Sequence, residues 1–513
     1  MHMRALILPS SSSKTLPALA PQLFAVLILL LALFGCGGNT STTGTTTSQP
    51  QNLQTLASQP PDGAGLGFLL TDGSVIFQGG RSSDWSRLTP DQSGSYLTGT
   101  WSQAASLPAG YAPDDFASAV QINGQVMITG GEYNFGNFVL TNLGAIYNPV
   151  ADTWTSLAPP TNWDYIGDSP SVVLPNGQFL VGQKIDMLMA ALDPNTLQWT
   201  PMASTGKSDF NAEEGWTLLP DGSVLTVDVL NAPNSERYIP SLQQWITAGN
   251  TPVDLHSPSP FGCINYGPGG SLCYFPPGEI GPAILRPDGT VFATGSAVTG
   301  AAAHTAIYTP PTNLTDPGSW VAGPDFPNDD NAGDCYAVLL PNGHVLVEGN
   351  SGTLYEFDGT TLTATGLVAP ESSLLVLPTG DVIIGGNTVQ LYTSPGQPSA
   401  SWAPTITTTF PAGITRGSTY AISGTQFNGL SQAAAYGDEQ QTATNYPLVR
   451  ITNQATGHVF YARTHDHSTM AVATGSTIVS TNFDVPPAME TGPSSLEVVA
   501  NGIPSASVSI TVN

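Results

Sequence analysis

Charged side chains are scarce in this sequence, and basic ones are the scarcest. The 513 residues include 11 Lys and Arg against 37 Asp and Glu, which gives a formal net charge of −26 at pH 7. This excess would repel a phosphate backbone and disfavours nucleic acid as a partner, whereas cations, basic peptides and neutral sugars remain open. The sequence also lacks a GxSxG nucleophile motif, a phosphate-binding loop, a zinc-protease helix and an EF-hand loop, so none of these common sites is indicated.

Cysteine is rare as well, with four residues in the chain. Cys263 and Cys273 bracket a Gly/Pro-rich insertion, and outside the cytoplasm a disulfide between them is the natural interpretation. A zinc site is less favoured, because neither residue belongs to a CxxC pair. Cys335 falls in an apolar strand, where we expect a buried thiol.

The one long apolar run, at residues 23–35, is too short to span a bilayer comfortably and fits the core of a signal peptide over residues 1–35. It ends in Leu-Phe-Gly-Cys at Cys36, which resembles a bacterial lipobox. The resemblance implies lipidation of Cys36 and a protein anchored in the bacterial cell envelope, at the outer membrane or outside the cell. Residues 36–54 would form a disordered Ser/Thr-rich tether. An ordinary cleaved signal peptide with a chance cysteine is the alternative.

A short phrase recurs seven times along the chain: an apolar run, usually Asp-Gly or Asn-Gly, a second apolar run and often Gly-Gly. Its turn residues are Asp72, Asn123, Asn176, Asp221, Asp288, Asn342 and Thr379. Asp-Gly and Asn-Gly tolerate positive φ and close tight turns, so each phrase predicts a β-hairpin. Repeats of about fifty residues with one hairpin each predict a seven-bladed, kelch-type β-propeller over residues 55–402.

Several repeats continue with an aromatic strand and then a Trp strand, which makes four strands in each unit. Residues 145–157, 190–202 and 237–249 show this continuation. We interpret these Tyr and Trp residues as core packing between blades rather than as a ligand site. The 55 Gly and 44 Pro fit the many turns of an all-β chain.

Beyond Trp402 the composition changes and seven further strand-like runs follow. They cover residues 404–410, 418–424, 447–453, 458–464, 476–486, 494–502 and 505–513. This spacing predicts an immunoglobulin-like β-sandwich, of the early-set kind, over residues 403–513. The predicted fold class is therefore all-β, with a propeller followed by a sandwich.

Acidic residues recur in phase with the hairpins. Eight residues before the turn stand Asp115, Asp168, Glu213, Asp334 and Glu371, and Glu279 stands nine before. Because the innermost strand begins there, we expect these six side chains to form an acidic ring at one end of the axial channel, with Asp114, Glu214 and Asp330 adding to the charge. Structural carboxylates that tie neighbouring blades together are the more common case. A site for a metal ion or a cationic ligand is the second interpretation, and both can hold in different blades.

Seven kelch-like units followed by such a tail domain resemble the galactose oxidase and glyoxal oxidase family of copper-radical enzymes, from about residue 55 to the end. The resemblance implies copper held by two Tyr and two His, one Tyr cross-linked to Cys and one His on a tail loop. His465 or His467 matches that last position, but Pro370-Glu371 stands where the family has Tyr-His, and Cys335-Tyr336 cannot form the cross-link. The radical centre therefore does not carry over.

The remaining candidate metal site is a mixed one made of His465, His467, Glu371 and Asp334, for calcium or copper. Alternatively, Arg463 and the imidazoles neutralise the acidic ring and dock the two domains.

The leading functional hypothesis is a monomeric, lipid-anchored module that binds carbohydrate or protein at the cell surface, with a divalent cation at the acidic ring. The alternatives are a divergent metal-dependent oxidase of alcohols, aldehydes or sugars, and a structural envelope or adhesion component. No catalytic residue is assigned, and the balance leans away from an enzyme. Five aromatic residues near the predicted loops are candidates for stacking on sugar rings: Tyr133, Trp163, Tyr165, Phe210 and Trp216.

Overall fold

The computed structural model describes residues 52–513, apart from 258–261, 266–270, 275–277, 299, 370–372 and 412, and for 262–265 and 271–274 it describes the backbone alone. Regular structure in these residues is β, except for two 3₁₀ turns at Pro327–Asp329 and Ala400–Trp402. The all-β prediction is therefore confirmed. The described residues contain no helix of the length and apolarity that a membrane crossing requires.

Each of the seven predicted turns joins two neighbouring antiparallel strands. The glycine of each turn has a positive φ, between 77° and 88°. The Asp, Asn or Thr before the glycine caps the turn: its side-chain oxygen accepts a hydrogen bond from the backbone N–H two residues later. Ser74 donates to Asp72 at 3.1 Å and Ser223 to Asp221 at 2.9 Å. The repeat thus combines a side-chain cap with one left-handed glycine.

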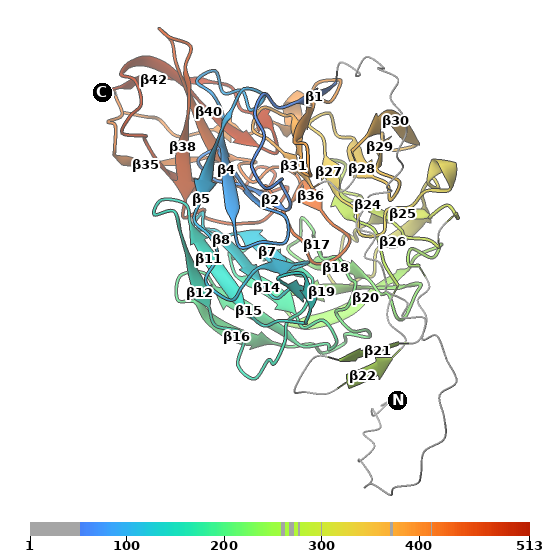
Figure 1. Ribbon diagram of the computed structural model, residues 1–513. Coiled ribbons are helices and arrows are strands. Elements are labelled where there is room, and N and C mark those ends of the chain that lie inside the picture. Colours follow the sequence, from blue (N-terminus) through green and yellow to red (C-terminus); the bar gives the residue numbers. More distant parts are fainter. Residues whose placement is uncertain are drawn as a thin grey trace, which may run out of the picture. The chain divides into compact units, whose positions relative to one another are not determined.

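These hairpins open consecutive four-stranded antiparallel sheets, which Figure 1 shows in chain order from blue to orange. The first four sheets consist of β2 (Gly67–Leu69), β3 (Val75–Gln78), β4 (Trp85–Thr89) and β5 (Thr100–Ala104); β7 (Ala117–Val120), β8 (Val126–Thr129), β11 (Gly144–Asn148) and β12 (Thr153–Leu157); β13 (Ser171–Val173), β14 (Phe179–Gly182), β15 (Met189–Asp193) and β16 (Gln198–Met202); and β17 (Thr217–Leu218), β18 (Val224–Val227), β19 (Asn234–Ile239) and β20 (Gln244–Asn250).

Three more sheets follow, and two of them take up a strand from a distant part of the chain. They consist of β23 (Ala283–Leu285), β24 (Val291–Thr294), β25 (Thr305–Thr309) and β26 (Ser319–Ala322); β27 (Ala337–Leu339), β28 (Val345–Glu348), β29 (Thr353–Phe357) and β30 (Leu362–Val368), with β36 (Ala434–Ala435) added; and β31 (Leu374–Val376), β32 (Val382–Ile384) and β33 (Gln390–Tyr392), with β1 (Leu53–Thr55) added.

Two small sheets lie in loops, and one larger sheet forms the tail. The small ones are β6 (Pro113–Asp114), β9 (Tyr133–Asn134) and β10 (Asn137–Phe138), and the pair β21 (Gly262–Asn265) and β22 (Ser271–Tyr274). The tail sheet contains β34 (Thr405–Ile406), β35 (Thr419–Thr425), β37 (Leu448–Asn453), β38 (Val459–His465), β39 (Val479–Asp484), β40 (Gly492–Ala500), β41 (Ile503–Pro504) and β42 (Val508–Val512). Every strand-like run of the tail sequence contains one of these strands.

The repeated aromatic residues pack in the core. Tyr147 and Trp154 face each other across β11 and β12, with ring centroids 5.1 Å apart, and Trp154 also lies 5.0 Å from Trp85 of the first sheet. Tyr238 and Trp245 repeat the first contact at 5.3 Å. Such pairs join strands within a sheet and one sheet to the next, as the sequence interpretation required.

Two long-range strand pairings tie distant parts of the chain together. Strand β1 completes the last sheet by pairing with β33, and the inner strands β2 and β31 contact each other. The tail contributes β36, which pairs with the innermost strand β27. Tyr446 adds a second link, because its buried hydroxyl donates to the carbonyl of Leu69 in β2 and its ring lies parallel to that of His467.

Replacing Tyr446 with Phe should lower the free energy of unfolding by about 1–3 kcal/mol, because the Leu69 carbonyl loses a buried partner that water cannot replace. Equilibrium urea unfolding measures the change. Tyr420→Phe is the matched control, since the Tyr420 hydroxyl accepts from Thr415 at an exposed position. Equal stability losses in the two variants would show that the Tyr446 link does not hold the tail in place.

Candidate functional site

Five of the six acidic residues predicted for one end of the sheets stand just before the first strand of a sheet. They are Asp115, Asp168, Glu213, Glu279 and Asp334, which precede β7, β13, β17, β23 and β27. The structure brings them together: the carboxyl groups of Glu279 and Asp334 hydrogen-bond each other, and both sense the charge of Glu213. Glu371 lies outside the described residues.

Three of these residues share an unusual backbone conformation. Asp115, Glu213 and Asp334 have φ values of 52°, 55° and 51°, in the left-handed region. For a residue with a side chain this conformation costs roughly 1 kcal/mol, so it persists only where the surrounding structure enforces it. Its recurrence at equivalent positions of three sheets shows that the start of the inner strand is held in one fixed geometry.

A buried ammonium group lies among the carboxylates. Lys184, on the loop after β14, has a side chain only 2% exposed. Its Nζ lies 2.8 Å from Oε1 of Glu213 and 3.9 Å from Oε1 of Glu132, and it also pairs with Asp168. Lysine is rarely buried unless it is paired, and here the pairing is multiple.

A segment of the tail completes the site. After β36 the chain runs through Asp438, Glu439, Gln440 and Gln441, all of them buried. The Gln440 side chain donates to Asp115 at 3.1 Å and accepts from the Tyr336 hydroxyl, and the backbone N–H of Gln441 donates to Ser118 in β7 at 3.2 Å. The tail thus reaches the ends of the inner strands with amide and carboxyl groups.

We call the following residues the acidic cluster: Asp115, Glu132, Asp168, Glu213, Glu279, Asp334, Asp438 and Glu439. Within it, one carboxylate oxygen from each of Asp168, Glu213 and Asp438 lies within 4.8 Å of the others, close enough for one metal ion to bind all three. Asp168 and Asp438 are 4% and 2% exposed, and the Oδ1 atom of each has no hydrogen-bond partner among the described residues. A buried carboxylate oxygen without a partner is costly, so these atoms favour a bound cation.

Burial and mutual repulsion raise the pKa values in the cluster. Burial, with the charges of Asp114 and Glu132, raises the pKa of Asp115 well above its ordinary value. Burial and the charge of Glu213 raise the pKa of Glu279 to about 8. Burial raises the pKa of Glu439 in the same way. At neutral pH part of the cluster therefore retains protons, and a cation would displace them.

The structure does not bring His465 and His467 to the acidic cluster, so neither imidazole joins Asp334; Glu371, the fourth predicted ligand, is not among the described residues. The backbone N–H of His467 donates to Ile122 in the hairpin turn after β7, whereas Asp115 precedes β7. At about 3.3 Å per residue these two ends lie roughly 20 Å apart.

Both imidazoles have partners inside the tail. His465 lies 2.7 Å from Asp466 and 3.2 Å from Asp484, and the buried His467 lies 2.9 Å from the Thr481 hydroxyl. Burial lowers the pKa of His467 to about 3, so its ring is neutral. Arg463 donates to the carbonyl of Asn123, which supports the expected docking role but places it at the turns.

Of the three further acidic residues predicted beside the ring, Asp114 lies at the acidic cluster, whereas Glu214 and Asp330 have partners elsewhere. Asp114 lies beside the cluster and pairs with Arg81 at 2.6 Å. Glu214 instead pairs with Lys207 at 2.7 Å inside the fourth sheet, and Asp330 accepts from Ser351 and Tyr355.

Two of the five aromatic candidates for sugar stacking are excluded. Trp163 and Trp216 are buried, 8% and 1% exposed, whereas Tyr133, Tyr165 and Phe210 are half-buried.

The cysteine predictions are partly corrected. Cys335 is fully buried but disulfide-bonded, so the expected free thiol is wrong. Cys263 and Cys273 stand opposite each other in β21 and β22, but their side chains lie outside the described residues, as does Cys36.

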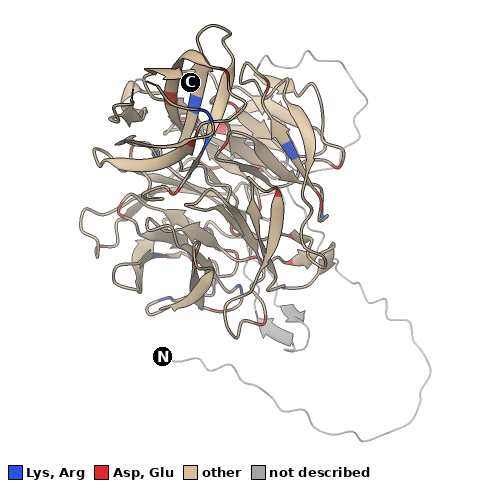
Figure 2. Ribbon diagram, turned by 90° about the vertical axis from the view of Figure 1, so that its left-hand side faces the viewer, with Lys and Arg blue, Asp and Glu red and all other residues tan. Residues whose placement is uncertain are grey.

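Sequence reasoning missed Glu132, Lys184 and the tail residues Asp438 to Gln441. Two signals were present: Lys184 is one of only 11 basic residues, and both Glu132 and Lys184 follow directly on a predicted hairpin. Figure 2 shows how few stretches of the ribbon are blue, the colour of Lys and Arg, among the described residues. The tail residues carried no such signal, because a polar stretch between strands reads as an exposed loop.

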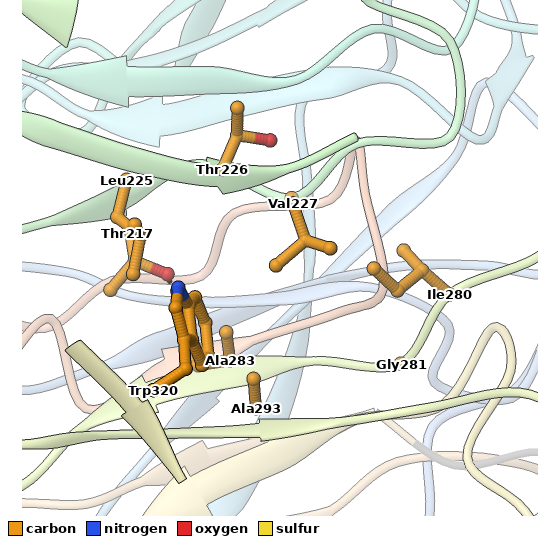
Figure 3. Close-up of a pocket in the computed structure, with 10 residues that line it drawn as sticks. Thr217, Leu225, Thr226, Val227, Ile280, Gly281, Ala283, Ala293 and Trp320 are labelled. Carbon is orange, nitrogen blue, oxygen red and sulfur yellow. Dashed lines mark hydrogen bonds between the residues drawn. The ribbon is translucent and has the colours of Figure 1, made fainter. Parts of the chain in front are cut away.

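One further pocket is apolar. It lies between the fourth and fifth sheets and is lined by Leu225, Val227, Ile280, Ala293 and Trp320, with two threonines (Figure 3). The Trp320 indole N–H is already bonded to the Ser235 hydroxyl at 2.9 Å. We therefore interpret this pocket as a packing gap between sheets.

No protein-family model and no curated protein matches the sequence. Among solved structures, the chain is similar to a fungal alcohol oxidase of the AA5 family in complex with copper, at 14% identity and a TM-score of 0.50, covering 90% of this chain and 98% of that one. It is also similar to a streptogramin B lyase (13% identity, 66% and 95% covered, TM-score 0.43) and to the extracellular domain of a one-component system from B. thetaiotaomicron (12%, 90% and 57%, 0.42).

Because these structures share only 12–14% identity with the chain, the comparisons give information about the fold alone. The likeness to the oxidase extends over nearly the whole of both chains and supports a β-propeller of that general kind. The other two TM-scores are too low to support an argument. Whether the chain shares any chemistry with the oxidase depends on its own side chains.

The raised pKa of Glu279 predicts that, with cations removed by a chelator, stability falls as pH rises from 6.5 to 8.5. In this window the unfolded glutamate is already ionised, while the folded one must lose its proton. His467 opposes this loss near pH 6.5, where its unfolded form is still half protonated, but only by about 0.4 kcal/mol. Urea unfolding should show a loss on the order of 1–2 kcal/mol from this group.

Glu279→Gln should flatten this slope, and Glu490→Gln should leave it unchanged, because hydrogen bonds to Thr456 and His458 lower the pKa of Glu490. A wild-type stability that is flat or rising over the same window would contradict the assignment.

Proposed function

We propose that this protein is a binding module whose ligand site is the acidic cluster, with a divalent cation held by Asp168, Glu213 and Asp438. The convergence of these three carboxylates, two of them with an unpartnered buried oxygen, is the observation that carries the proposal. The residues come from two different sheets and from the tail, so a cation would also hold these elements together.

The donor set selects the metal. The three converging donors are all carboxylate oxygens, which suit calcium, magnesium or manganese. Copper, the metal of the AA5 oxidase, favours imidazole and thiolate ligands. No imidazole belongs to a group of three converging donors in the part of the chain that the structure describes. The copper centre that the fold family implies therefore does not fit these residues.

Lys184 competes with the cation for two of the three ligands. Its ammonium already pairs with Asp168 and Glu213, so a divalent ion must displace it or share them. Shared ligands lower the affinity for the ion but keep the carboxylates compensated when it is absent. This arrangement suits a cation that exchanges with the surroundings rather than one locked in during folding.

Isothermal titration of chelator-treated protein with Ca²⁺ or Mn²⁺ should show one saturable site. Asp438→Asn should weaken binding at least tenfold, because a ligand becomes a neutral amide, whereas Lys184→Gln should tighten it by removing the competitor. Lys184→Gln should also become unstable without cation and recover with it, since Asp168 and Glu213 then repel each other.

Asp466→Asn, at an exposed carboxylate of the tail, is the matched control and should bind as the wild type does. The cation assignment is wrong if the wild type shows no saturable binding. It is also wrong if Asp438→Asn binds the ion as tightly as the wild type does.

A metal-dependent oxidase is the second candidate function, favoured by the likeness to the AA5 enzyme and by a pair of buried tyrosines. The rings of Tyr336 and Tyr436 lie 4.7 Å apart beside the cluster, and burial raises the pKa of both. We expect no alcohol-dependent hydrogen peroxide from copper-loaded protein. Peroxide release that Tyr336→Phe abolishes would favour the oxidase instead.

We also propose a specific architecture for the sheets and the tail. The seven four-stranded sheets fit a seven-bladed kelch-type propeller, and the tail strands fit an immunoglobulin-like domain. The lipobox-like end of the apolar run supports a lipid anchor in the bacterial envelope. We further propose that the protein is monomeric and binds a carbohydrate or protein ligand.

A further inference from the structure

The hairpin β9–β10 is built around a residue that its turn disfavours. Its two-residue turn is Phe135–Gly136, and both residues are left-handed, with φ values of 51° and 69°. Turns of this kind strongly prefer Asn, Asp or Gly, because a bulky side chain is strained there. Phe135 is also 52% exposed. The backbone N–H of Phe135 donates to the Ala112 carbonyl at 2.9 Å and so helps to hold the turn, but this contact does not require an exposed aromatic side chain.

A second exposed ring of the hairpin, that of Phe138, is held in a fixed position. Phe138, 45% exposed, packs edge-on against Tyr133, with centroids 5.7 Å apart. The Arg81 guanidinium covers the Tyr133 ring at 5.7 Å and pairs with Asp114 at 2.6 Å. An aromatic group that is already immobilised loses little conformational entropy on binding.

The hairpin rises directly from the acidic cluster. The backbone N–H of Glu132, the residue before β9, lies 3.1 Å from the carbonyl oxygens of both Asp114 and Asp115. Strand β9 pairs with β6, which contains Asp114. The loop that carries Lys184 also presents the exposed side chain of Leu188, 43% exposed. Apolar side chains and carboxylates therefore share the same two loops.

The charges beside the hairpin identify the kind of ligand. The acidic cluster has eight carboxyl groups and Asp114 adds a ninth, against the two basic groups Lys184 and Arg81 that pair with them. Protons retained by part of the cluster reduce this excess, and the part-exposed carboxylates of Asp114 and Glu132 lie beside the hairpin. Such a surface repels anionic polymers and complements a ligand with positive groups next to apolar ones.

We propose that the β9–β10 hairpin and the acidic cluster form one docking surface for a polypeptide segment in which basic and apolar side chains alternate. Phe135, Phe138 and Leu188 contact its apolar side chains, and its Lys or Arg side chains face Asp114 and Glu132, the part-exposed carboxylates beside the hairpin. The inference rests on the proposed function in placing the ligand at the acidic cluster, and it adds the class of ligand and the element that selects it.

Fluorescence anisotropy with a labelled octapeptide of alternating lysine and leucine tests the proposal. The wild type should bind it saturably at 0.15 M salt, more tightly than a lysine–serine or a glutamate–leucine octapeptide. Phe135→Asn should weaken binding at least fivefold. Because Asn suits the turn, the variant should melt at the same or a higher temperature, which separates loss of contact from loss of fold.

Ile478→Thr is the control, since Ile478 is a similarly exposed apolar residue in the tail, and it should bind as the wild type does. Equal affinity of Phe135→Asn and wild type overturns the proposal. So does equal affinity for the lysine–leucine and lysine–serine peptides, which would indicate charge attraction alone.

A neutral glucose or N-acetylglucosamine hexamer that binds through Phe135 would replace the peptide with a carbohydrate ligand. Calcium titration of Phe135→Asn keeps the two proposals distinguishable, because the variant should take up the cation normally whether or not the peptide binds.

Discussion

The structure depends on the register that each hairpin turn imposes on its two inner strands. The side-chain cap and the left-handed glycine fix where the turn lies, and the short inner strands then fix where the sheet begins. Seven repetitions align seven strand starts at one end of the sheets. A residue at a constant distance before the turn consequently meets its equivalents from the other sheets, which is how residues as far apart as Asp115 and Asp334 come to share a cluster.

Concentrating carboxylates in this way creates mutual repulsion, and the chain has very few basic side chains to compensate it. Both lysines in the described part of the sequence are buried against carboxylates, Lys184 in the acidic cluster and Lys207 against Glu214 and Glu236. The cluster is still under-compensated: burial, together with the charges of neighbouring carboxylates, raises the pKa values of Asp115 and Glu279. Retained protons, a divalent ion and a basic ligand are three ways to supply the missing positive charge, and they compete with one another.

The sequence was informative where structure follows from local chemistry. The turns, the inner strands, the aromatic core pairs and the acidic positions before β7, β13, β17, β23 and β27 all follow from spacing within a repeat. What could not be predicted depends on contacts between distant segments. The burial of Asp438 and Gln441 depends on β36 pairing with β27, and no periodic pattern marks a two-residue strand. His465 was misplaced for the same reason: its distance in sequence does not reveal which end of the sheets the tail loop meets.

The tail decides which donor atoms meet the ends of the inner strands. In this chain the segment that reaches the inner strands brings Asp438, Glu439 and two glutamines, while the imidazoles dock against the hairpin turns at the opposite end. The converging donors at the junction of sheets and tail are therefore carboxylate oxygen atoms. Because oxygen donors attract hard cations and basic side chains rather than copper, the same junction suits recognition of positive charge. The exposed ring of Phe135, on a strained turn beside it, would give that recognition an apolar component.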